Sequence, residues 1–231
     1  MPSINMIMLQ TVAAGLRELR KEVVFIGGAV AELYADDPEA SDIRPTLDID
    51  CVVQISSKIE YNKLEDKLRN KKFSNDTSPG APICRWVFND IKVDVMPADT
   101  DILGFTNSWY TEGIENKMVK TLEDGTEIFV FTPEYYLAAK FEAHDSRGGN
   151  DLRQSHDFED IVYIFENRSS ILDDISCSNL SVKEFIKEAC RNLKNNDNLK
   201  EGIECALPYG SDSDSTEIIE DIILNIAKMK V

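Results

Sequence analysis

The stretch RPTLDIDCVV, residues 44–53, constrains the fold of this chain more than any other. Ile49 and Val52 are typical of a buried strand, yet Asp48 and Asp50 lie in the same run. Side chains alternate between the faces of a strand, so the two carboxylates share one face, with their Cα atoms roughly 7 Å apart. Like charges on one face of a sheet are destabilising unless a cation holds them. The pattern therefore predicts a sheet with a negatively charged spot on one face.

A second run, IKVDVMP at residues 91–97, adds a third carboxylate. Its valines alternate with Asp94, so Asp94 faces away from the apolar side of the strand. If this strand lies next to the first, Asp94 converges with Asp48 and Asp50. Carboxylate oxygens together with substrate phosphates are the ligands that Mg²⁺ (or Mn²⁺) takes. The alternative is that the D-x-D pair is only a solvated part of an edge strand.

In the predicted site, Asp48 and Asp50 bind one or two metal ions. Asp94 shares the second metal and acts as a base toward an incoming hydroxyl group. About twenty residues upstream, Gly27 and Gly28 form a turn between an apolar strand and a predicted helix. Glycines at such a turn let the backbone approach a phosphate at the helix N-terminus. By itself the pair of glycines would indicate only a turn.

The order of predicted elements indicates an α+β protein. Strands alternate with helices up to residue 131. Two of the predicted strands, PICRWVFND and IKVDVMP, are joined at Asn89-Asp90, which predicts a hairpin turn. From residue 132 onward only helices are predicted. We therefore expect a mixed β-sheet flanked by helices in residues 1–131 and a helical domain in residues 132–231. The predicted helices span residues 5–21, 29–36, 58–70, 133–144, 155–167, 181–194 and 215–229.

Composition restricts the class of protein. No run approaches the roughly 18 uncharged apolar residues that cross a bilayer. The apolar N-terminal stretch carries its basic residues after the apolar part, which indicates a core helix and not a leader. The five cysteines are odd in number and lack a C-x-x-C, the pattern of free thiols in a cytoplasmic protein. A net charge of −17 disfavours non-specific binding to nucleic acid.

Taken together, FIGGAVAEL (25–33), RPTLDIDCVV and IKVDVMP resemble the DNA polymerase β-like nucleotidyltransferase superfamily. The shared pattern is a Gly-Gly or Gly-Ser turn, an hDhD strand and a third Asp on another strand. Within it, the GG-x-A turn, RPTLDID and LAAKFEAHDSRGGNDLRQSHDFEDIV (137–162) are similar to the AbiE-type toxin nucleotidyltransferase group. The resemblance spans roughly residues 20–168. One departure is Ala29 after Gly28, where many members carry Ser, so phosphate contact would come from backbone N–H groups.

The resemblance implies a nucleotidyltransferase-type sheet and the transfer of a nucleoside monophosphate from a nucleoside triphosphate (ATP or GTP) to an acceptor hydroxyl, with Mg²⁺. It also implies the toxin of a toxin–antitoxin pair, with a cognate antitoxin and with RNA (tRNA in some relatives) or protein as acceptor. One alternative keeps the chemistry with a small acceptor such as an aminoglycoside. Another is a non-catalytic nucleotide-binding or interaction module, which a sheet order separating Asp94 from Asp48 and Asp50 would favour.

A second candidate site lies on the helices after residue 132. Lys140 shares an apolar helix face with Phe141 and His144, where its ammonium could hold a nucleotide phosphate or could snorkel to water. The resemblance places Asp157 or Asp160 near this lysine, and the sequence does not choose between them. Asp157 is also explained as a first-turn acid behind a Ser155 N-cap. A histidine–aspartate metal-hydrolase pattern is disfavoured because the two His-Asp pairs lie too close in sequence.

Overall fold

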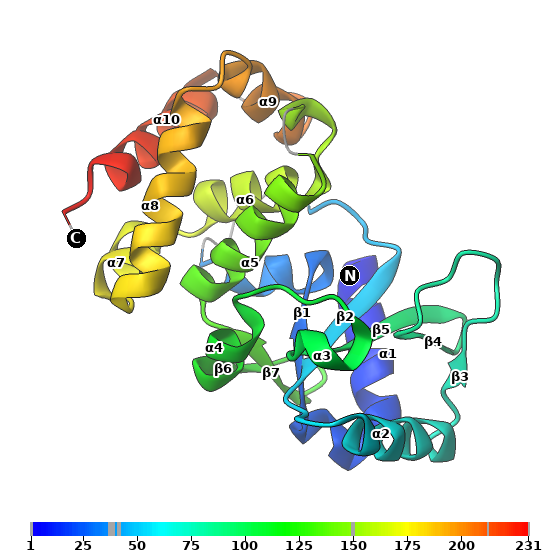
Figure 1. The fold of residues 1–231 in the computed structure, drawn as a ribbon. Coiled ribbons are helices and arrows are strands. Elements are labelled where there is room, and N and C mark those ends of the chain that lie inside the picture. The colour runs from blue at the N-terminus through cyan, green and yellow to red at the C-terminus, as the bar shows by residue number, and fades with distance from the viewer. Residues whose placement is uncertain (1, 37–39, 41–42, 149–150, 212, 231) are drawn as a thin grey trace. The chain divides into compact units, whose positions relative to one another are not determined.

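The computed structural model describes residues 2–36, 40, 43–148, 151–211 and 213–230 (Figure 1). The chain forms two compact units. The sheet unit comprises Met1–Val30 and Arg44–Thr132, and the helical unit comprises Ala31–Ile43 and Pro133–Val231. The helical unit thus takes in residues 31–43, which the sequence analysis assigned to the first domain. Most of the acidic loop at residues 36–42 lies outside the described residues.

The sheet unit is built on a mixed sheet, and this confirms the predicted α+β class. Its described strands follow the order β3-β4-β5-β2-β1-β7-β6. The pairs β2–β5 and β1–β7 are parallel and the remaining pairs are antiparallel. The strands are β1 (Val23–Ile26), β2 (Asp48–Val53), β3 (Ser74–Asn75), β4 (Arg85–Phe88), β5 (Ile91–Pro97), β6 (Lys117–Thr121) and β7 (Glu127–Phe131). The short β3 and the hairpin strand β6 were not predicted from the sequence.

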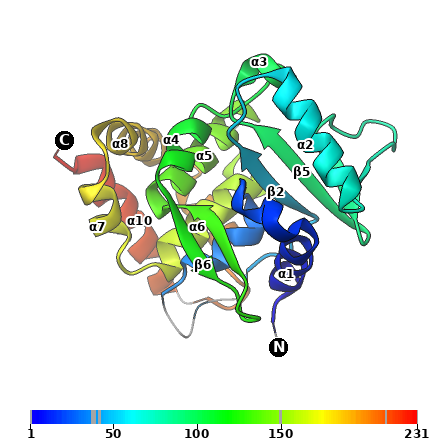
Figure 2. The ribbon, with the colours of Figure 1, turned by 90° about the horizontal axis from the view of Figure 1, so that it is seen from below.

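Two helices of the sheet unit, α1 (Ile4–Leu16) and α2 (Lys58–Asn70), cover one face of the sheet, as Figure 2 shows. A Cβ at Gly15 of α1 would lie 2.5 Å from the ring of Phe88. The guanidinium of Arg69 on α2 lies 5.4 Å from the ring centroid of Trp86. Since side chains alternate along β4, Arg85 projects from the opposite face. The helices therefore cover the apolar face and leave the face of Arg85 to other contacts.

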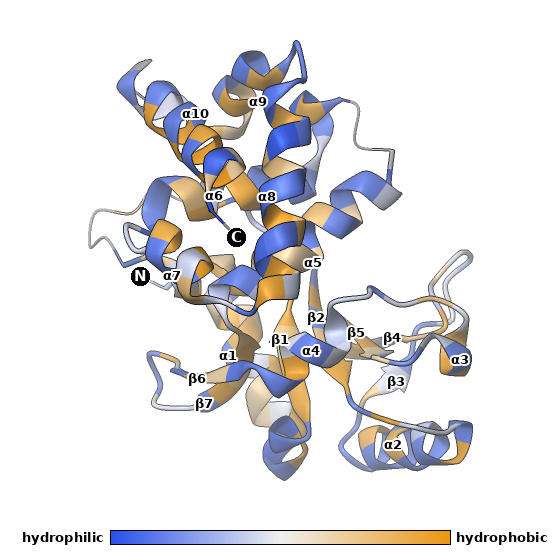
Figure 3. Cartoon of the chain, turned by 60° about the vertical axis from the view of Figure 1, so that its left-hand side comes forward, coloured by the Kyte–Doolittle hydropathy of each residue, from blue (hydrophilic) through white to orange (hydrophobic). Residues whose placement is uncertain are grey.

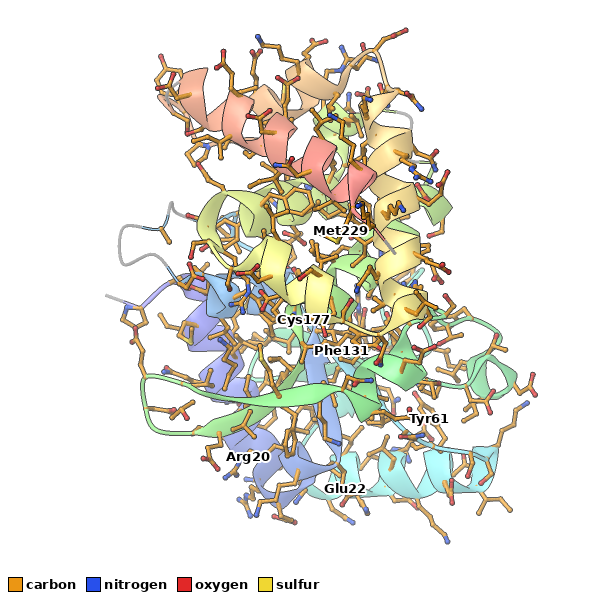
Figure 4. The ribbon with its side chains drawn as sticks, turned by 90° about the vertical axis from the view of Figure 1, so that its left-hand side faces the viewer. Arg20, Glu22, Tyr61, Phe131, Cys177 and Met229 are labelled. Atoms are coloured by element: carbon orange, nitrogen blue, oxygen red, sulfur yellow. The ribbon has the colours of Figure 1, made fainter. Side chains whose placement is uncertain are left out.

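Local sequence explains the ends of these helices. Ser57 caps α2 by accepting a hydrogen bond from the backbone N–H of Glu60, so α2 spans the predicted residues 58–70. The hydroxyl of Tyr61 donates to the carbonyl of Val95 across 3.1 Å (Figure 4). The predicted helix 5–21 is only partly correct. It ends as an α-helix at Leu16, and a 3-10 helix, η1 (Arg17–Lys21), follows because Arg17 adopts a positive φ of 53°.

The remaining elements of the sheet unit are α3 (Thr100–Leu103) and α4 (Tyr110–Glu115). The 3-10 helix η2 (Gly28–Tyr34) runs from the sheet unit into the helical unit. The helical unit also contains α5 (Pro133–Ser146), η3 (Leu152–Gln154), α6 (His156–Asn167), α7 (Ile171–Cys177), α8 (Leu180–Lys194), α9 (Leu199–Ala206) and α10 (Ser213–Lys228). Of these, η3, α7 and α9 were not predicted. Among the described residues, no helix is long and apolar enough to cross a membrane.

Burial follows the apolar pattern in both units. The apolar residues of β1 form a continuous stripe (Figure 3), and all four of its residues are buried. In the helical unit, α5 packs against α6 and α8, and α8 packs against α10. All five cysteines are free, as predicted. Those that are buried are Cys51, Cys84 and Cys190, and those that are exposed are Cys177 and Cys205.

Candidate carboxylate site

The structure brings the three predicted carboxylates of the sheet unit onto one face of two neighbouring strands. Strands β2 and β5 are parallel, with Asp50 in register with Asp94. Residues in register on adjacent strands point to the same face, and adjacent strands lie about 4.8 Å apart. Asp48 precedes Asp50 by two residues and shares that face. The sheet order therefore does not separate Asp94 from the D-x-D pair, which removes the observation that would have favoured a non-catalytic module.

An arginine that the sequence analysis did not single out holds two of these carboxylates. Arg85 donates from Nε to Asp94 Oδ1 at 2.8 Å and from Nη2 to Asp94 Oδ2 at 2.7 Å. The same Nη2 donates to Asp48 Oδ2 at 2.9 Å. The Arg85 side chain is 18% exposed and that of Asp94 is 10% exposed, so the contact is largely shielded from water. Hydrogen bonding to Asp94 raises the pKa of Arg85, and its guanidinium stays charged at every accessible pH.

The sequence contained a signal that predicts this contact. The predicted hairpin at Asn89-Asp90 is present, and both residues have positive φ angles, 49° and 62°. A two-residue turn with two positive φ angles is the type I′ turn that fixes the register of a hairpin. Counting outward from that turn pairs Arg85 with Asp94, as the structure shows. The position of β2 beside β5 has no such local signal, so the contact with Asp48 could not be predicted.

Gly27 has a role that concerns Asp50 directly. It adopts a positive φ of 76°, and a Cβ at this position would lie 2.0 Å from Asp50 Oδ2. Only glycine leaves room for that carboxylate at the end of β1. Gly28 begins the 3-10 helix η2 and not the α-helix that the sequence predicted. Phosphate binding at the two glycines stays a prediction, while the close approach of Gly27 to Asp50 is a feature of the structure.

The second candidate site forms a charged cluster inside the helical unit. Lys140 Nζ lies 3.1 Å from Asp157 Oδ1 and 2.6 Å from Asp160 Oδ2. Arg147 Nη1 lies 2.6 Å from Asp157 Oδ2. Ser155 caps α6 by accepting from the N–H of Phe158, as predicted. The sequence left open which aspartate accompanies Lys140, and both do; the lysine is held by carboxylates and does not simply extend into water.

The two histidines have separate environments. His144 is buried and its Nδ1 lies 2.7 Å from Ser155 Oγ. His156 is exposed and its Nδ1 lies 2.9 Å from Glu159 Oε2. Within the described parts of the chain, no group of three or more His, Cys, Asp or Glu side chains is arranged to hold a metal ion. In the sheet unit the reason is visible, because Arg85 already bridges Asp48 and Asp94.

The donor set of the sheet unit nevertheless fits a hard divalent cation. Asp50 and Asp94 are in register, Asp48 lies two residues away on the same face, and the three carboxylates offer the oxygen ligands that Mg²⁺ and Mn²⁺ take. The guanidinium of Arg85 provides the positive charge that such a cluster requires in the present arrangement. Asp48, Asp50 and Asp94 are thus chemically suited to a metal, and the bridging position between Asp48 and Asp94 is occupied by an arginine.

No protein-family model matches the chain, and no curated protein matches its sequence. Among solved structures, the chain is similar to the crystal structure of a "putative nucleotidyltransferase from H. pylori". The two share 12% sequence identity with a TM-score of 0.47. The alignment covers 99% of this chain and 96% of that one.

Proposed function

We propose that the sheet unit is the catalytic domain of a Mg²⁺- or Mn²⁺-dependent nucleotidyltransferase. The observation that carries the proposal is the placement of Asp48, Asp50 and Asp94 on one face of neighbouring parallel strands. Gly27, which only as glycine admits the Asp50 carboxylate, supports it. Arg85 offsets one of the three negative charges, and the excess that remains on adjacent strands is costly for the fold, which supports a binding role.

In the proposed reaction, an acceptor hydroxyl attacks the α-phosphorus of a nucleoside triphosphate. A bond forms from the acceptor oxygen to this phosphorus, the bond to the β-phosphate oxygen breaks, and pyrophosphate leaves. Asp94 accepts the proton of the hydroxyl. Asp48, Asp50 and Asp94 would hold the divalent cation, which would neutralise charge on the triphosphate. Gly27 and Gly28 offer backbone N–H groups to the phosphates.

For the helical unit we propose nucleotide binding by Lys140, Asp157 and Asp160. The lysine is 12% exposed and the two aspartates are 5% and 3% exposed, so the cluster is rigidly held. Two carboxylates fix the position of the ammonium group, and a phosphate would be a further partner for it. The assignment of a catalytic role to the sheet unit and of nucleotide binding to the helical unit is part of this proposal.

We propose the class of acceptor from the net charge of the chain and from the resemblance of its sequence motifs to the toxin group. The toxin group implies transfer to RNA or protein and a cognate antitoxin in a cytoplasmic setting. A net charge of −17 favours a protein or a short RNA segment over an extended RNA footprint, because phosphate contacts come from Lys and Arg. A small hydroxyl compound is the alternative acceptor.

The test is calorimetric titration with ATP, GTP, CTP and UTP, each with and without Mg²⁺. We expect metal-dependent binding of at least one nucleotide, and its loss in the Asp48→Ala/Asp50→Ala double variant. A matched control is Glu65→Ala/Asp66→Ala on α2, which removes the same charge where the two acids pair with Arg69. Folded protein that binds no nucleotide, or a control variant that loses binding equally, would count against the enzyme and favour an interaction module.

A further inference from the structure

We infer that Arg85 is an internal competitor for the metal, and that its guanidinium, once displaced from Asp48 and Asp94, becomes a phosphate-binding group. This inference rests on the proposed function and extends it to a residue outside the recognised motifs. The first argument is geometric. Arg85 engages both oxygens of Asp94 and one oxygen of Asp48, which are two of the three carboxylates that would hold a cation.

The second argument concerns the strength of the contact. The fork of an arginine against one carboxylate gives two parallel charge-assisted hydrogen bonds, the strongest kind of side-chain pairing. Both partners are shielded, with side chains 18% and 10% exposed. A cation that approaches the same two oxygens would lie next to the guanidinium charge, so repulsion between the two positive charges favours exchange of these bonds over addition to them. Metal binding and the position of Arg85 are therefore coupled.

The third argument concerns the position of the guanidinium group after a metal ion displaces it. Arg85 is anchored on β4, which pairs along β5, so its head group stays near the three carboxylates after release. A displaced guanidinium in a largely shielded position requires an anionic partner. The phosphates of an incoming nucleotide supply one, and arginine matches phosphate oxygens in the same two-bond geometry as carboxylate. This would supply the side-chain contact that Ala29, in place of a serine, does not.

The test begins with Mn²⁺ alone, titrated into the full chain and followed by electron paramagnetic resonance. Removing the competitor in Arg85→Ala should tighten Mn²⁺ binding at least about tenfold, since hydrogen bonds to charged groups are of that size. Arg85→Lys keeps the positive charge but cannot form two parallel hydrogen bonds to one carboxylate. Its affinity for Mn²⁺ should lie between that of Arg85→Ala and that of the unaltered protein. Arg69→Ala, which loses an arginine on the other face of the sheet, is the matched control and should bind Mn²⁺ as the unaltered protein does.

A second measurement follows Arg85 itself. Phenylglyoxal modifies free guanidinium groups, and mass spectrometry reports modification at position 85. We expect slow modification without ligand, faster modification with Mn²⁺, and renewed protection with Mn²⁺ and a nucleotide together. If Arg85 only supports the fold, its rate of modification should be the same without ligand, with Mn²⁺, and with Mn²⁺ and a nucleotide.

The outcomes separate the inference from the proposed function. If Mn²⁺ binding disappears in Asp48→Ala/Asp50→Ala but is unchanged in Arg85→Ala and Arg85→Lys, the inference is overturned and the proposed function stands. If Mn²⁺ leaves the modification rate at Arg85 unchanged, the inference is likewise overturned. Absence of Mn²⁺ binding in every folded variant would overturn both. Circular dichroism establishes folding, and Arg85→Lys keeps the test valid if Arg85→Ala does not fold.

Discussion

Replacing Gly27 by alanine should destabilise the sheet unit more than the same change at any exposed turn glycine. Two costs combine at this position. The φ of 76° is unfavourable for an L-residue, at about 1–2 kcal/mol. The added Cβ would also lie 2.0 Å from Asp50 Oδ2, and relieving such overpacking costs a further ~1–3 kcal/mol.

A comparison with Gly125→Ala separates the backbone cost from the steric cost. Its φ is 81°, yet a Cβ there meets no atom within 4 Å, so Gly125→Ala carries only the backbone cost. We expect Gly27→Ala to lose about 1–3 kcal/mol more in the free energy of unfolding than Gly125→Ala. In an Asp50→Ala background the contacts with Asp50 Oδ2 and Cγ are gone, but the Cβ of residue 50 still lies 2.9 Å from the added Cβ. The excess loss of Gly27→Ala over the Gly125 control should therefore shrink without vanishing.

The assay is urea denaturation followed by tryptophan fluorescence. The chain has two tryptophans, Trp86 and Trp109, and both belong to the sheet unit, so the signal reports on that unit. Equal losses for Gly27→Ala and Gly125→Ala would refute the steric argument. So would a Gly27→Ala loss that persists undiminished when Asp50 is absent.

Three further predictions concern titratable groups, both buried and exposed. Lys140→Met should lower the free energy of unfolding by about 3–5 kcal/mol, because it removes the ammonium group that the buried Asp157 and Asp160 share, while Asp157 keeps its ion pair with Arg147. Far-UV circular dichroism melting measures it, and a loss below about 1 kcal/mol would contradict it. In native protein, Cys177 and Cys205 should react readily with Ellman's reagent, and the other thiols only after unfolding. Burial raises the pKa of Cys84 from about 9 to about 12. The unfolded thiol therefore ionises first, and the stability from this group, complete below pH 9, should fall as the pH rises toward 12. A Cys84→Ala chain with the same alkaline loss would disprove this assignment.

The sequence predicted the parts of the site that depend on local geometry. Alternation along one strand placed Asp48 and Asp50 on the same face, and alternation along another placed Asp94 opposite its valines. The hairpin at Asn89-Asp90 was also found. These features depend on the two-residue period of a strand and on turn chemistry, both of which are visible within a few residues.

The features that escaped prediction depend on distant contacts or weak local signals. The adjacency of β2 and β5 is a pairing between segments far apart in sequence, which no periodicity encodes. Strand β6 alternates exposed and half-buried residues and lacks an apolar face. The stretch after Gly28 has a helical composition, yet it forms the 3-10 helix η2 and crosses into the other unit. In that case tertiary packing overrode local propensity.

The pairing of Arg85 with Asp94 also has a consequence for folding kinetics. Hairpin β4–β5 is closed by a two-residue turn, and such hairpins form in about 1–10 μs, well before pairings of high sequence separation. The arginine therefore meets Asp94 early, so β2 brings its two carboxylates to a strand whose charge is already balanced. Arg85 then lowers the electrostatic barrier to assembling the sheet. Refolding of Arg85→Lys and Arg85→Ala at low and high salt measures this, and salt should accelerate only the Arg85→Ala chain.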